Sequence, residues 1–488
     1  MTRSHPKQIS RSGDDLEDGL RLEPGLDVMA QKTISASDSL SRGGLPLAMR
    51  WMLTAAAIIV VSALSLTLIE DPLLARALIV TGACLALWLS EAVPPYVPTL
   101  VLWALVPLLL QPFGDEFRLT RVLGWAADPV LALFLGGFAL SVAASRYGID
   151  AQIARIAVKL SNGRRLRLLV LVASATAILS MWMSNIAGAA MMIVALHPLL
   201  ADVPKDDPFR RALLIGIALG ANLGGIATPI GTGPNAIAIA AVSKHQTITF
   251  LHWMAFALPL AIGMLAAGVA LTGWRFRVRG DAHLPELPKH QQHSQGAKWI
   301  VAIFSVTVLA WLTEPIHGIP SALVSLMTTA VLFGSGLLDR QDISRIDWST
   351  LLLIAGGISL GNLLQQSGVV RAAAASVPWD QVPHLALILM LCFASAFLSA
   401  LMSNTATATM LIPLAASLDP SPSTAILVAI TASFGIPFVI STPPNAMVYG
   451  EGGIRSSDLL STGFVLMILG CLLVALTGPF ILKLIGVT

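Results

Sequence analysis

Two short runs of small polar residues recur inside the most apolar parts of this sequence. Each run places a serine four residues before a Ser-Asn pair: Ser180 before Ser184-Asn185, and Ser399 before Ser403-Asn404. Residues four apart share one face of an α-helix, so each run gathers hydroxyls and an amide on one side. Such groups are costly inside a membrane unless they meet polar partners or a ligand. The two copies therefore predict two matching half-sites.

A second polar element follows each run. Proline and glycine interrupt an apolar stretch at residues 228–235 and again at residues 441–445. Proline removes a backbone donor and glycine permits unusual dihedral angles, so each stretch predicts a helix that is broken inside the membrane. Unwound backbone at that depth has to be enclosed by protein or to line a cavity. The broken ends offer carbonyl oxygens to a cation and N–H groups to an anion.

Each polar run, with the break that follows it, predicts a small cage of neutral oxygens. Hydroxyl, amide and carbonyl oxygens without carboxylates suit a monovalent cation such as Na⁺ better than a divalent metal. The predicted first cage is made of Ser180, Ser184, Asn185 and the Gly231 carbonyl, and the second of Ser399, Asn404 and the Ser441 carbonyl. A single Ser-Asn pair is usually a packing or capping feature. Two copies, each followed by a helix break in the same order, favour a functional role.

Neutral donors and helix N-termini between the two cages predict a binding site for a small anionic substrate. No acidic side chain lies near either run to repel an anion. The residues expected to line this site are Asn185, Ile186, Thr232, Asn404, Thr405, Thr442 and Pro443.

Membrane helices must position these residues. The chain has 488 residues, of which 55% are hydrophobic and 12% charged, and its mean hydropathy is +0.78. Soluble domains carry about 25% charged residues. Repeated apolar runs of about 18 residues or more predict an all-α polytopic membrane protein embedded in the lipid bilayer. Nothing in the charge pattern suggests nucleic acid as a partner, and the three cysteines fall in apolar runs, which predicts packing residues rather than disulfides or metal ligands.

Two apolar stretches, 168–200 and 383–418, are too long for one crossing and carry the polar runs near their middle, and the hairpins predicted from them cover 165–202 and 383–418. Basic residues precede and follow the first stretch, so both of its ends face the cytoplasm and it enters and returns as a re-entrant hairpin. If both stretches are hairpins and the N-terminus is cytoplasmic, 24 of the 30 Lys and Arg residues lie on the cytoplasmic side and only six lie outside the cell. The sequence therefore predicts eleven transmembrane helices plus two hairpins, a cytoplasmic N-terminus and multi-pass insertion in the cell inner (plasma) membrane.

Matching features recur in the same order along the chain. Gly136-Gly137 matches Gly356-Gly357 at an offset of 220 residues, and Pro234-Asn235 matches Pro444-Asn445 at an offset of 210. An odd number of crossings in each unit predicts two inverted repeats, which are typical of secondary transporters. The predicted organisation is a disordered cytoplasmic tail at 1–48, a first transmembrane helix at 49–73, repeat 1 at 74–274, a cytoplasmic linker at 275–297 and repeat 2 at 298–488.

The paired runs and breaks resemble those of the divalent-anion/sodium symporter family, which carries dicarboxylates, citrate and sulfate. Ser403-Asn404-Thr405 and Thr442-Pro443-Pro444-Asn445 match that family's second motif and second break, and the resemblance covers nearly all of 51–488. It implies a homodimer of scaffold and transport domains with elevator-type movement. It also implies Na⁺ as the coupling ion at the two cages and a carboxylate substrate between them, with no organic cofactor.

Ile186 stands where the first motif of that family has threonine. Losing a donor to a charged group costs about 1.5–3 kcal/mol, so the sequence predicts a substrate that is shorter, less symmetric or singly charged on this side, while the cation cage does not need that hydroxyl. The leading prediction is a secondary active transporter of small organic dianions, C4 dicarboxylates first, by Na⁺ symport. The alternatives are sodium-independent exchange, another anion such as citrate, tartrate or sulfate, and, less favoured, an anion channel. An intramembrane enzyme is disfavoured because neither H-E-x-x-H nor G-x-S-x-G occurs.

Overall fold

The computed structural model describes residues 46–90, 92–243, 246–281, 295–375, 382–419 and 421–487. Within these ranges the chain is helical, and β structure is limited to one isolated bridge between Arg164 and Asp281. The predicted tail lies almost wholly outside the described residues, as does the central part of the predicted linker.

The first half of the chain begins with a series of helices. They are α2 (Leu47–Leu68), α3 (Pro72–Ser90), α4 (Val97–Leu110), α5 (Leu119–Gly124), α6 (Pro129–Arg146) and α7 (Ile149–Ser161), with two short 3₁₀ turns, η2 (Gln111–Phe113) and η3 (Asp115–Phe117). Of these helices, α2 to α5 pack on one another in order, as do α6 and α7. The helices that carry the first polar run and the first break follow. They are α8 (Arg165–Ser180), α9 (Asn185–Asp202), α10 (Pro208–Gly224), η4 (Gly225–Ala227), α11 (Gly233–Val242) and α12 (Phe250–Arg275).

The second half has a similar order of elements. It starts with α13 (Gln295–Leu312), α14 (Glu314–His317), α15 (Ser321–Gly334), α16 (Arg340–Ile343), α17 (Trp348–Gln366) and α18 (Val369–Ala375). The second polar run and break lie in α19 (His384–Leu401), α20 (Asn404–Leu418), α21 (Pro422–Ala432), η6 (Val439–Ser441), α22 (Pro443–Gly450) and α23 (Ser456–Leu484).

Both predicted hairpins are present. Helix α8 ends at Ser180 and α9 begins at Asn185, so the chain turns within the polar run. The two limbs return to one base, where Arg165 lies 3.4 Å from Asp207. In the second hairpin, His384 at the start of α19 lies 2.9 Å from Asp419, just after α20. The 16 residues of α8 span about 24 Å, less than the bilayer core of about 30 Å, so the tip stays within the membrane.

Both predicted helix breaks are also present, between α10 and α11 and between α21 and α22. Among the described residues, nine helices are long and apolar enough to span a membrane, and two of these, α9 and α19, are hairpin limbs. The other crossings are built from shorter apolar helices, including the half-helices α11 and α21. When the two halves of each broken helix count as one crossing, the helices follow the predicted plan of eleven crossings and two hairpins.

Small residues let the first hairpin lie close to the first broken helix. Gly216, Gly220 and Gly224 form a stripe along α10 at intervals of four residues. A Cβ at Gly220 would overlap the Ala173 carbonyl, and one at Gly224 would overlap the Ala177 carbonyl. Membrane helices associate through such close backbone contact, because the hydrophobic effect does not drive apolar side chains out of lipid and into contact with one another.

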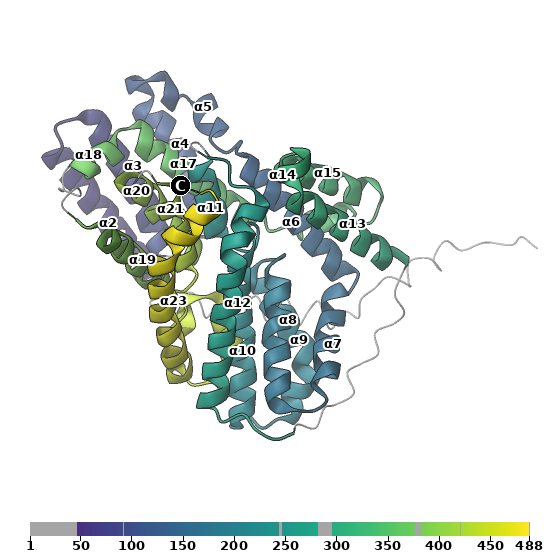
Figure 1. The fold of residues 1–488 in the computed structure, drawn as a ribbon. Coiled ribbons are helices and arrows are strands. Elements are labelled where there is room, and N and C mark those ends of the chain that lie inside the picture. The colour runs from purple at the N-terminus through teal and green to yellow at the C-terminus, as the bar shows by residue number, and fades with distance from the viewer. Residues whose placement is uncertain are drawn as a thin grey trace, which may run out of the picture.

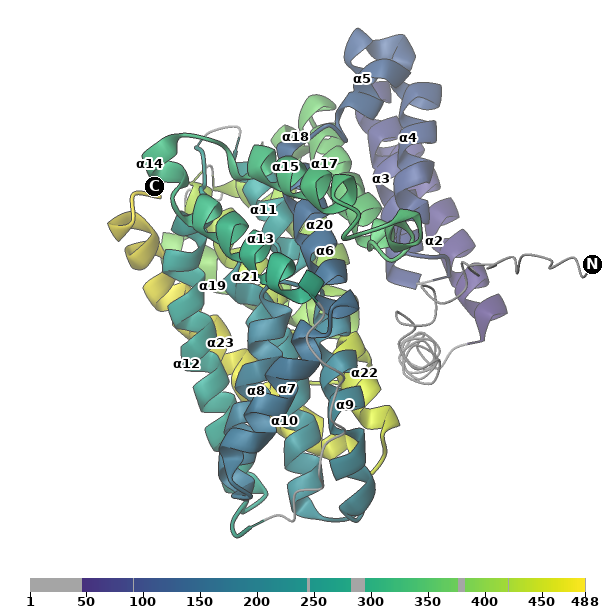
Figure 2. The same ribbon diagram turned by 90° about the vertical axis from the view of Figure 1, so that its right-hand side faces the viewer.

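The two halves of the chain pack crosswise at the centre. The second limb of the first hairpin, α9, contacts α22, and the second limb of the second hairpin, α20, contacts α11. Figures 1 and 2 show α7, α8, α9, α10, α12 and α23 gathered in the lower part of the molecule, with α2 to α5 and α13 to α15 around its upper part. Each hairpin tip therefore meets a helix break in the interior.

Candidate functional site

The tip of the first hairpin packs against the first helix break. The Asn185 side-chain oxygen lies 2.9 Å from Ser180 Oγ and 3.2 Å from the carbonyl oxygens of both Ala221 and Gly231. Ser180 Oγ also lies 2.6 Å from the Ala221 carbonyl oxygen. Of these four oxygens, which we call the first cluster, only the Ser180 hydroxyl brings a proton to share. The predicted first cage thus gains an unforeseen member, Ala221, and keeps Ser180, Asn185 and Gly231 together.

The Asn185 amide has two orientations with opposite consequences. As it stands, its oxygen faces the two carbonyls, and a small cation among the four oxygens would complete the cluster. When the amide is reversed, its nitrogen donates to Gly231 O and Ala221 O at 3.2 Å and to Ser180 Oγ at 2.9 Å. The reversed amide therefore satisfies the cluster through hydrogen bonds alone.

The second tip is arranged differently. Ser399 Oγ donates to Asn404 Oδ1 at 2.7 Å. Ser441 reaches the tip through its hydroxyl, which donates to the Ala400 carbonyl at 3.0 Å and accepts from the Phe438 N–H at 2.9 Å. The sequence prediction used the Ser441 carbonyl, so the same residue meets the tip through a different atom.

The serines that directly precede the two asparagines act as helix caps. Ser184 Oγ accepts from the Ala187 N–H at 3.3 Å, and Ser403 Oγ accepts from the Ala406 N–H at 3.2 Å. Each cap satisfies one of the free N–H groups at the start of the second hairpin limb. Ser184, predicted as a cation ligand, thus already uses part of its oxygen to hold α9 in place.

One asparagine in each half holds its break open. The Asn235 side-chain nitrogen donates to the carbonyls of Gly225 at 3.0 Å and Thr228 at 2.8 Å. In the other half, the Asn445 nitrogen donates to the carbonyls of Ile436 and Phe438, both at 2.9 Å. Buried carbonyls in an unwound segment need such partners. The two breaks are therefore built with the same hydrogen bonds.

Contacts across the centre connect the two halves. Asn222 in α10 is 1% exposed, and its side-chain nitrogen donates to Asn445 Oδ1 at 3.2 Å. Gly233, the first residue of α11, has no room for a Cβ because Thr405 Oγ1 occupies that space. The first break therefore touches the tip of the second hairpin directly.

Four helices begin at the tips and breaks, namely α9, α11, α20 and α22. The N–H groups and dipole at a helix N-terminus favour negative charge, so this centre suits an anion without fixed positive charge. Thr232 makes no capping bond to α11, whereas Thr442 Oγ1 accepts from the Asn445 N–H at 3.4 Å.

Exposure separates the residues that were predicted to line the anion site. Thr442 is buried, at 2% exposed. Ile186 is half-buried and packs against the apolar core. The half-buried members of the predicted set are Asn185, Ile186, Thr232, Asn404, Thr405 and Pro443.

Sequence reasoning assigned no role to several groups that complete this centre. Asn222, the carbonyl of Ala221 and the ring N–H of Trp253, which donates to Ile226 O at 3.0 Å, all act through tertiary contacts. Asn222 had one visible signal, since it is an amide within the apolar run that becomes α10. The Ala221 carbonyl had none, because every residue has one.

Comparison with known proteins gives consistent results. The profile of a family described as citrate transporters matches residues 85–432. An uncharacterised transporter of Haemophilus influenzae is 31% identical over 416 residues, covering 80% of this chain and 88% of that protein. The sodium-dependent dicarboxylate transporter SdcS of Staphylococcus aureus is 25% identical over 443 residues, covering 82% of this chain and 84% of that one.

Two further matches differ in kind. The inorganic phosphate transporter PHO87 of Saccharomyces cerevisiae is 28% identical over 421 residues, which cover 81% of this chain, and the chain spans about half (45%) of that longer protein. The crystal structure of the YdaH transporter of Alcanivorax borkumensis aligns with a TM-score of 0.55 at 18% identity, over 79% of this chain and 97% of that one. At this identity the structure supports the fold alone.

Proposed function

Since the chain belongs to the citrate transporter family of secondary transporters, we propose that it carries small organic dianions, C4 dicarboxylates first, by symport with Na⁺. The predicted resemblance to divalent-anion/sodium symporters is thereby confirmed at the level of the family. The named activity of the staphylococcal relative supports both the substrate class and the ion.

The observation that carries the proposal is the first cluster. Ser180 Oγ lies 2.9 Å from Asn185 Oδ1 and 2.6 Å from Ala221 O, and Asn185 Oδ1 lies 3.2 Å from both Ala221 O and Gly231 O. Among these four atoms only the Ser180 hydroxyl carries a proton. Facing oxygens repel unless a proton or a cation lies between them. Their neutrality matches a monovalent ion, because a divalent ion usually recruits carboxylates.

The substrate half of the proposal rests on the four helix N-termini. In this proposal a dianion lies between Asn185, Thr232 and Ile186 on one side and Asn404, Thr405, Thr442 and Pro443 on the other. Na⁺ in the first cage and, at Ser399, Asn404 and Ser441, in the second would supply the positive charge that the anion needs. Binding of the ion and of the anion would then favour each other.

We extend the proposal to the whole molecule. Two inverted repeats form a homodimer in the cell inner membrane with a cytoplasmic N-terminus, and the hairpins and broken helices move as an elevator against the other helices. The matched bonds of Asn235 and Asn445 support the repeat. Helix α2, of whose apolar window only 11% is buried within one chain, offers surface to lipid or to a second copy.

The reversed Asn185 amide favours a second candidate, sodium-independent exchange. In that orientation the two N–H groups of the amide are shared among Gly231 O, Ala221 O and Ser180 Oγ, and no cation is needed to satisfy the cluster. The protein would then return across the membrane only when loaded with another anion.

Uptake into proteoliposomes separates the two candidates. Labelled succinate uptake should rise with an inward Na⁺ gradient and fall when K⁺ replaces Na⁺. Uptake that ignores Na⁺ but requires internal succinate would establish the exchanger. Citrate, tartrate, sulfate and inorganic phosphate as competitors would rank the substrates.

A substitution in the first cluster sharpens the ion assignment. Ser180→Ala removes one oxygen of the cluster, so half-maximal uptake should need several-fold more Na⁺. Ser395→Ala is the matched control, because Ser395 is also fully buried on a hairpin limb but donates to Val428 O, at 2.8 Å, away from either tip. Equal Na⁺ dependence in the two variants would contradict a cation at the first cluster.

A further inference from the structure

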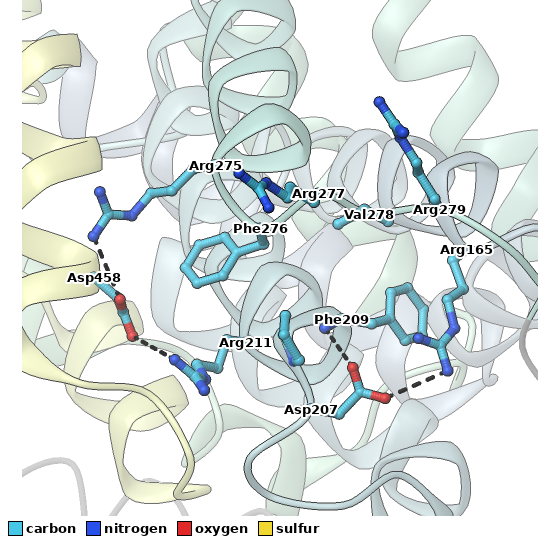
Figure 3. A pocket seen from close by; sticks show the side chains of 11 residues that line it. Arg165, Asp207, Phe209, Arg211, Arg275, Phe276, Arg277, Val278, Arg279 and Asp458 are labelled. Carbon is cyan, nitrogen blue, oxygen red and sulfur yellow. Dashed lines mark hydrogen bonds and ion pairs between the residues drawn. The ribbon is translucent and has the colours of Figure 1, made fainter.

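A cavity of about 560 Å³ lies at the base of the first hairpin, where it shares no residue with the tips and breaks. It is open to one side and is lined by the first turns of α8, α10 and α23 and by the end of α12 with the segment that follows (Figure 3). Five arginines and two aspartates line it: Arg165, Arg211, Arg275, Arg277, Arg279, Asp207 and Asp458.

The two aspartates of this cavity are already used by its walls. Asp207 pairs with Arg165 at 3.4 Å and accepts from the Phe209 N–H at 2.8 Å. Asp458 lies 3.8 Å from Arg211 and 3.5 Å from Arg275, so it is shared between them.

Arg277 and Arg279 have no ion-pair partner among the described residues, and Figure 3 shows both without one. Together with the shared Asp458, this leaves the cavity with three more cations than anions. Such an excess within one hollow favours a ligand that carries more than one negative charge.

The backbone conformation of Arg277 is one that disfavours any residue with a side chain, which indicates that the arginine is retained at this position for its guanidinium group. Helix α12 closes with a hydrogen bond from the Val278 N–H to Gly273 O at 3.0 Å, which places Arg277 at the left-handed position that glycine usually occupies. Its φ is +47°. A left-handed conformation is unfavourable for residues with a Cβ.

Basic residues on the cytoplasmic side of a membrane protein are ordinary. The positive-inside pattern explains the presence of basic residues on this side of the membrane. It does not explain why they line one cavity, nor why one of them has a left-handed backbone conformation.

The chemistry of the lining suits phosphate. Guanidinium groups bind phosphate oxygens through two parallel hydrogen bonds, and they stack on aromatic rings. The Arg165 guanidinium lies 5.0 Å from the Phe209 ring centre, and that of Arg275 lies 5.8 Å from the Phe276 ring centre. Both of these arginines also pair with an aspartate of the wall, Arg165 with Asp207 and Arg275 with Asp458, so their guanidinium groups are positioned beside the cavity.

The position of the cavity suits the membrane surface. Trp274, beside Arg275, is 78% exposed, as expected for a tryptophan at the level of the lipid headgroups.

We propose that this cavity binds a phosphate-bearing anion, either the headgroup of an anionic phospholipid or a free polyphosphate. The ligand would bridge the base of the first hairpin, at Arg165, to the end of α12 and the segment that follows it, at Arg275 and Arg277. It braces the helices that carry the first cluster, and it acts at a site separate from the transported anion. The inference concerns binding alone, so it stands or falls independently of the proposed transport.

The test measures thermal unfolding of the purified full-length protein in neutral detergent at constant ionic strength. The probes are sodium pyrophosphate and dihexanoyl-phosphatidylglycerol, with dihexanoyl-phosphatidylcholine as the zwitterionic control. Arg277→Gly removes the guanidinium and relaxes the backbone, so the variant is expected to fold at least as well as the wild type.

Two matched variants control for backbone and charge. Asn162→Gly changes the other described non-glycine residue with positive φ, at +49°, and Arg167→Gln removes an exposed positive charge from α8 outside the cavity. In the wild type and in both controls, at least one of the two phosphate probes should raise Tm. Arg277→Gly should need about tenfold or more of the same probe, the effect of losing one charge-assisted contact.

The responses to the two phosphate probes distinguish a lipid headgroup from a soluble phosphate. A response to phosphatidylglycerol alone assigns a lipid headgroup, and a response to pyrophosphate alone assigns a soluble phosphate. Both responses together assign the shared phosphate chemistry. No response to either probe, an equal response to phosphatidylcholine, or an undiminished response in Arg277→Gly would overturn the proposal.

Discussion

The two hairpin tips share one sequence pattern but differ in how they are held. Trp182 at the first tip stacks on Phe250 at 6.1 Å and on Trp311 at 6.3 Å between ring centres. The matching residue at the second tip, Leu401, is 55% exposed. The first tip is thus anchored to α12 and α13, while the second presents an apolar side chain outward. The duplicated pattern determines where a tip forms, and the neighbouring helices determine how firmly it is held.

The polar groups of the two tips differ as well. At the first tip, the Ser180 hydroxyl faces Asn185 Oδ1 and the Ala221 carbonyl, and the Asn185 amide oxygen faces two carbonyls unless the amide is reversed. At the second, Ser399 and Ser441 each donate to one acceptor, Asn404 Oδ1 and the Ala400 carbonyl respectively. The first tip therefore has the greater need for a cation or a reversed amide, so Na⁺ sensitivity should concentrate there.

The bases of the two hairpins differ in charge chemistry. Arg165–Asp207 closes the first and His384–Asp419 closes the second. Arginine stays charged at every accessible pH, whereas histidine does not. Burial acts to raise the pKa of Asp419, but hydrogen bonds from Thr424, the Ser421 N–H and His384 hold that pKa below its usual value. The second base is therefore the one that should respond to pH.

Removing the tip amides should have the largest effect. Asn404→Ala and Asn185→Ala should each lower succinate uptake about a hundredfold, because each deletes a polar group at the proposed ion and anion sites. Uptake and thermal unfolding are measured on the same preparations. If folded Asn404→Ala protein transported succinate like the wild type, the second tip would not be part of the binding site, and the two tips would not have equivalent roles.

Cutting back the tip anchors tests the contrast in how the tips are held. Trp182→Ala should lower the free energy of unfolding by about 2–3 kcal/mol, since it removes a stacked, partly buried ring. Leu401→Ala should lower it by under about 0.5 kcal/mol, because the side chain is mostly exposed. Denaturant unfolding in detergent micelles measures both variants. Equal losses would mean that the two tips are held alike.

Exchanging the residues after the tip asparagines tests the anion site. Ile186→Thr should tighten succinate binding about tenfold by adding a donor to a charged group, and Thr405→Ile should weaken it about as much. Competition against labelled succinate gives both affinities. An unchanged or weaker affinity in Ile186→Thr would show that the first side does not contact the substrate through this position.

The smallest effect concerns the base of the second hairpin. Because the folded pKa of Asp419 is lowered, its stabilising contribution is present above the unfolded pKa of about 3.9 and is lost as the pH falls through the folded value. Asp419→Asn should therefore cost under about 1 kcal/mol near pH 6, and this difference should shrink toward pH 3. Unfolding of wild type and variant at several pH values measures it. A difference that grows on acidification would reverse the assigned sign.

Much of the fold followed from local patterns. Apolar runs of membrane length, a polar run at the middle of two overlong stretches, and Pro-Gly interruptions are each readable within about twenty residues of sequence. The hairpins that turn before Asn185 and Asn404, and the breaks before Gly233 and Pro443, lie where these patterns predict them. Residues that are neighbours in the sequence determine such features, so they can be predicted without knowing the tertiary structure.

The composition of the site depended on tertiary packing. The Ala221 carbonyl, the bond from Asn222 to Asn445 and the contact of Gly233 with Thr405 join residues that no periodicity relates. The arginine cavity likewise unites Arg165, Arg275 and Asp458 from three distant helices.

The sequence by itself thus determined that polar tips and broken helices would exist and where they lie. The tertiary structure alone decided which of their atoms face one another. The physical reason is that helix formation and interruption depend on neighbours in the chain, whereas the choice between a carbonyl and a hydroxyl, as at Ser441, depends on ångström-scale packing between segments far apart in sequence.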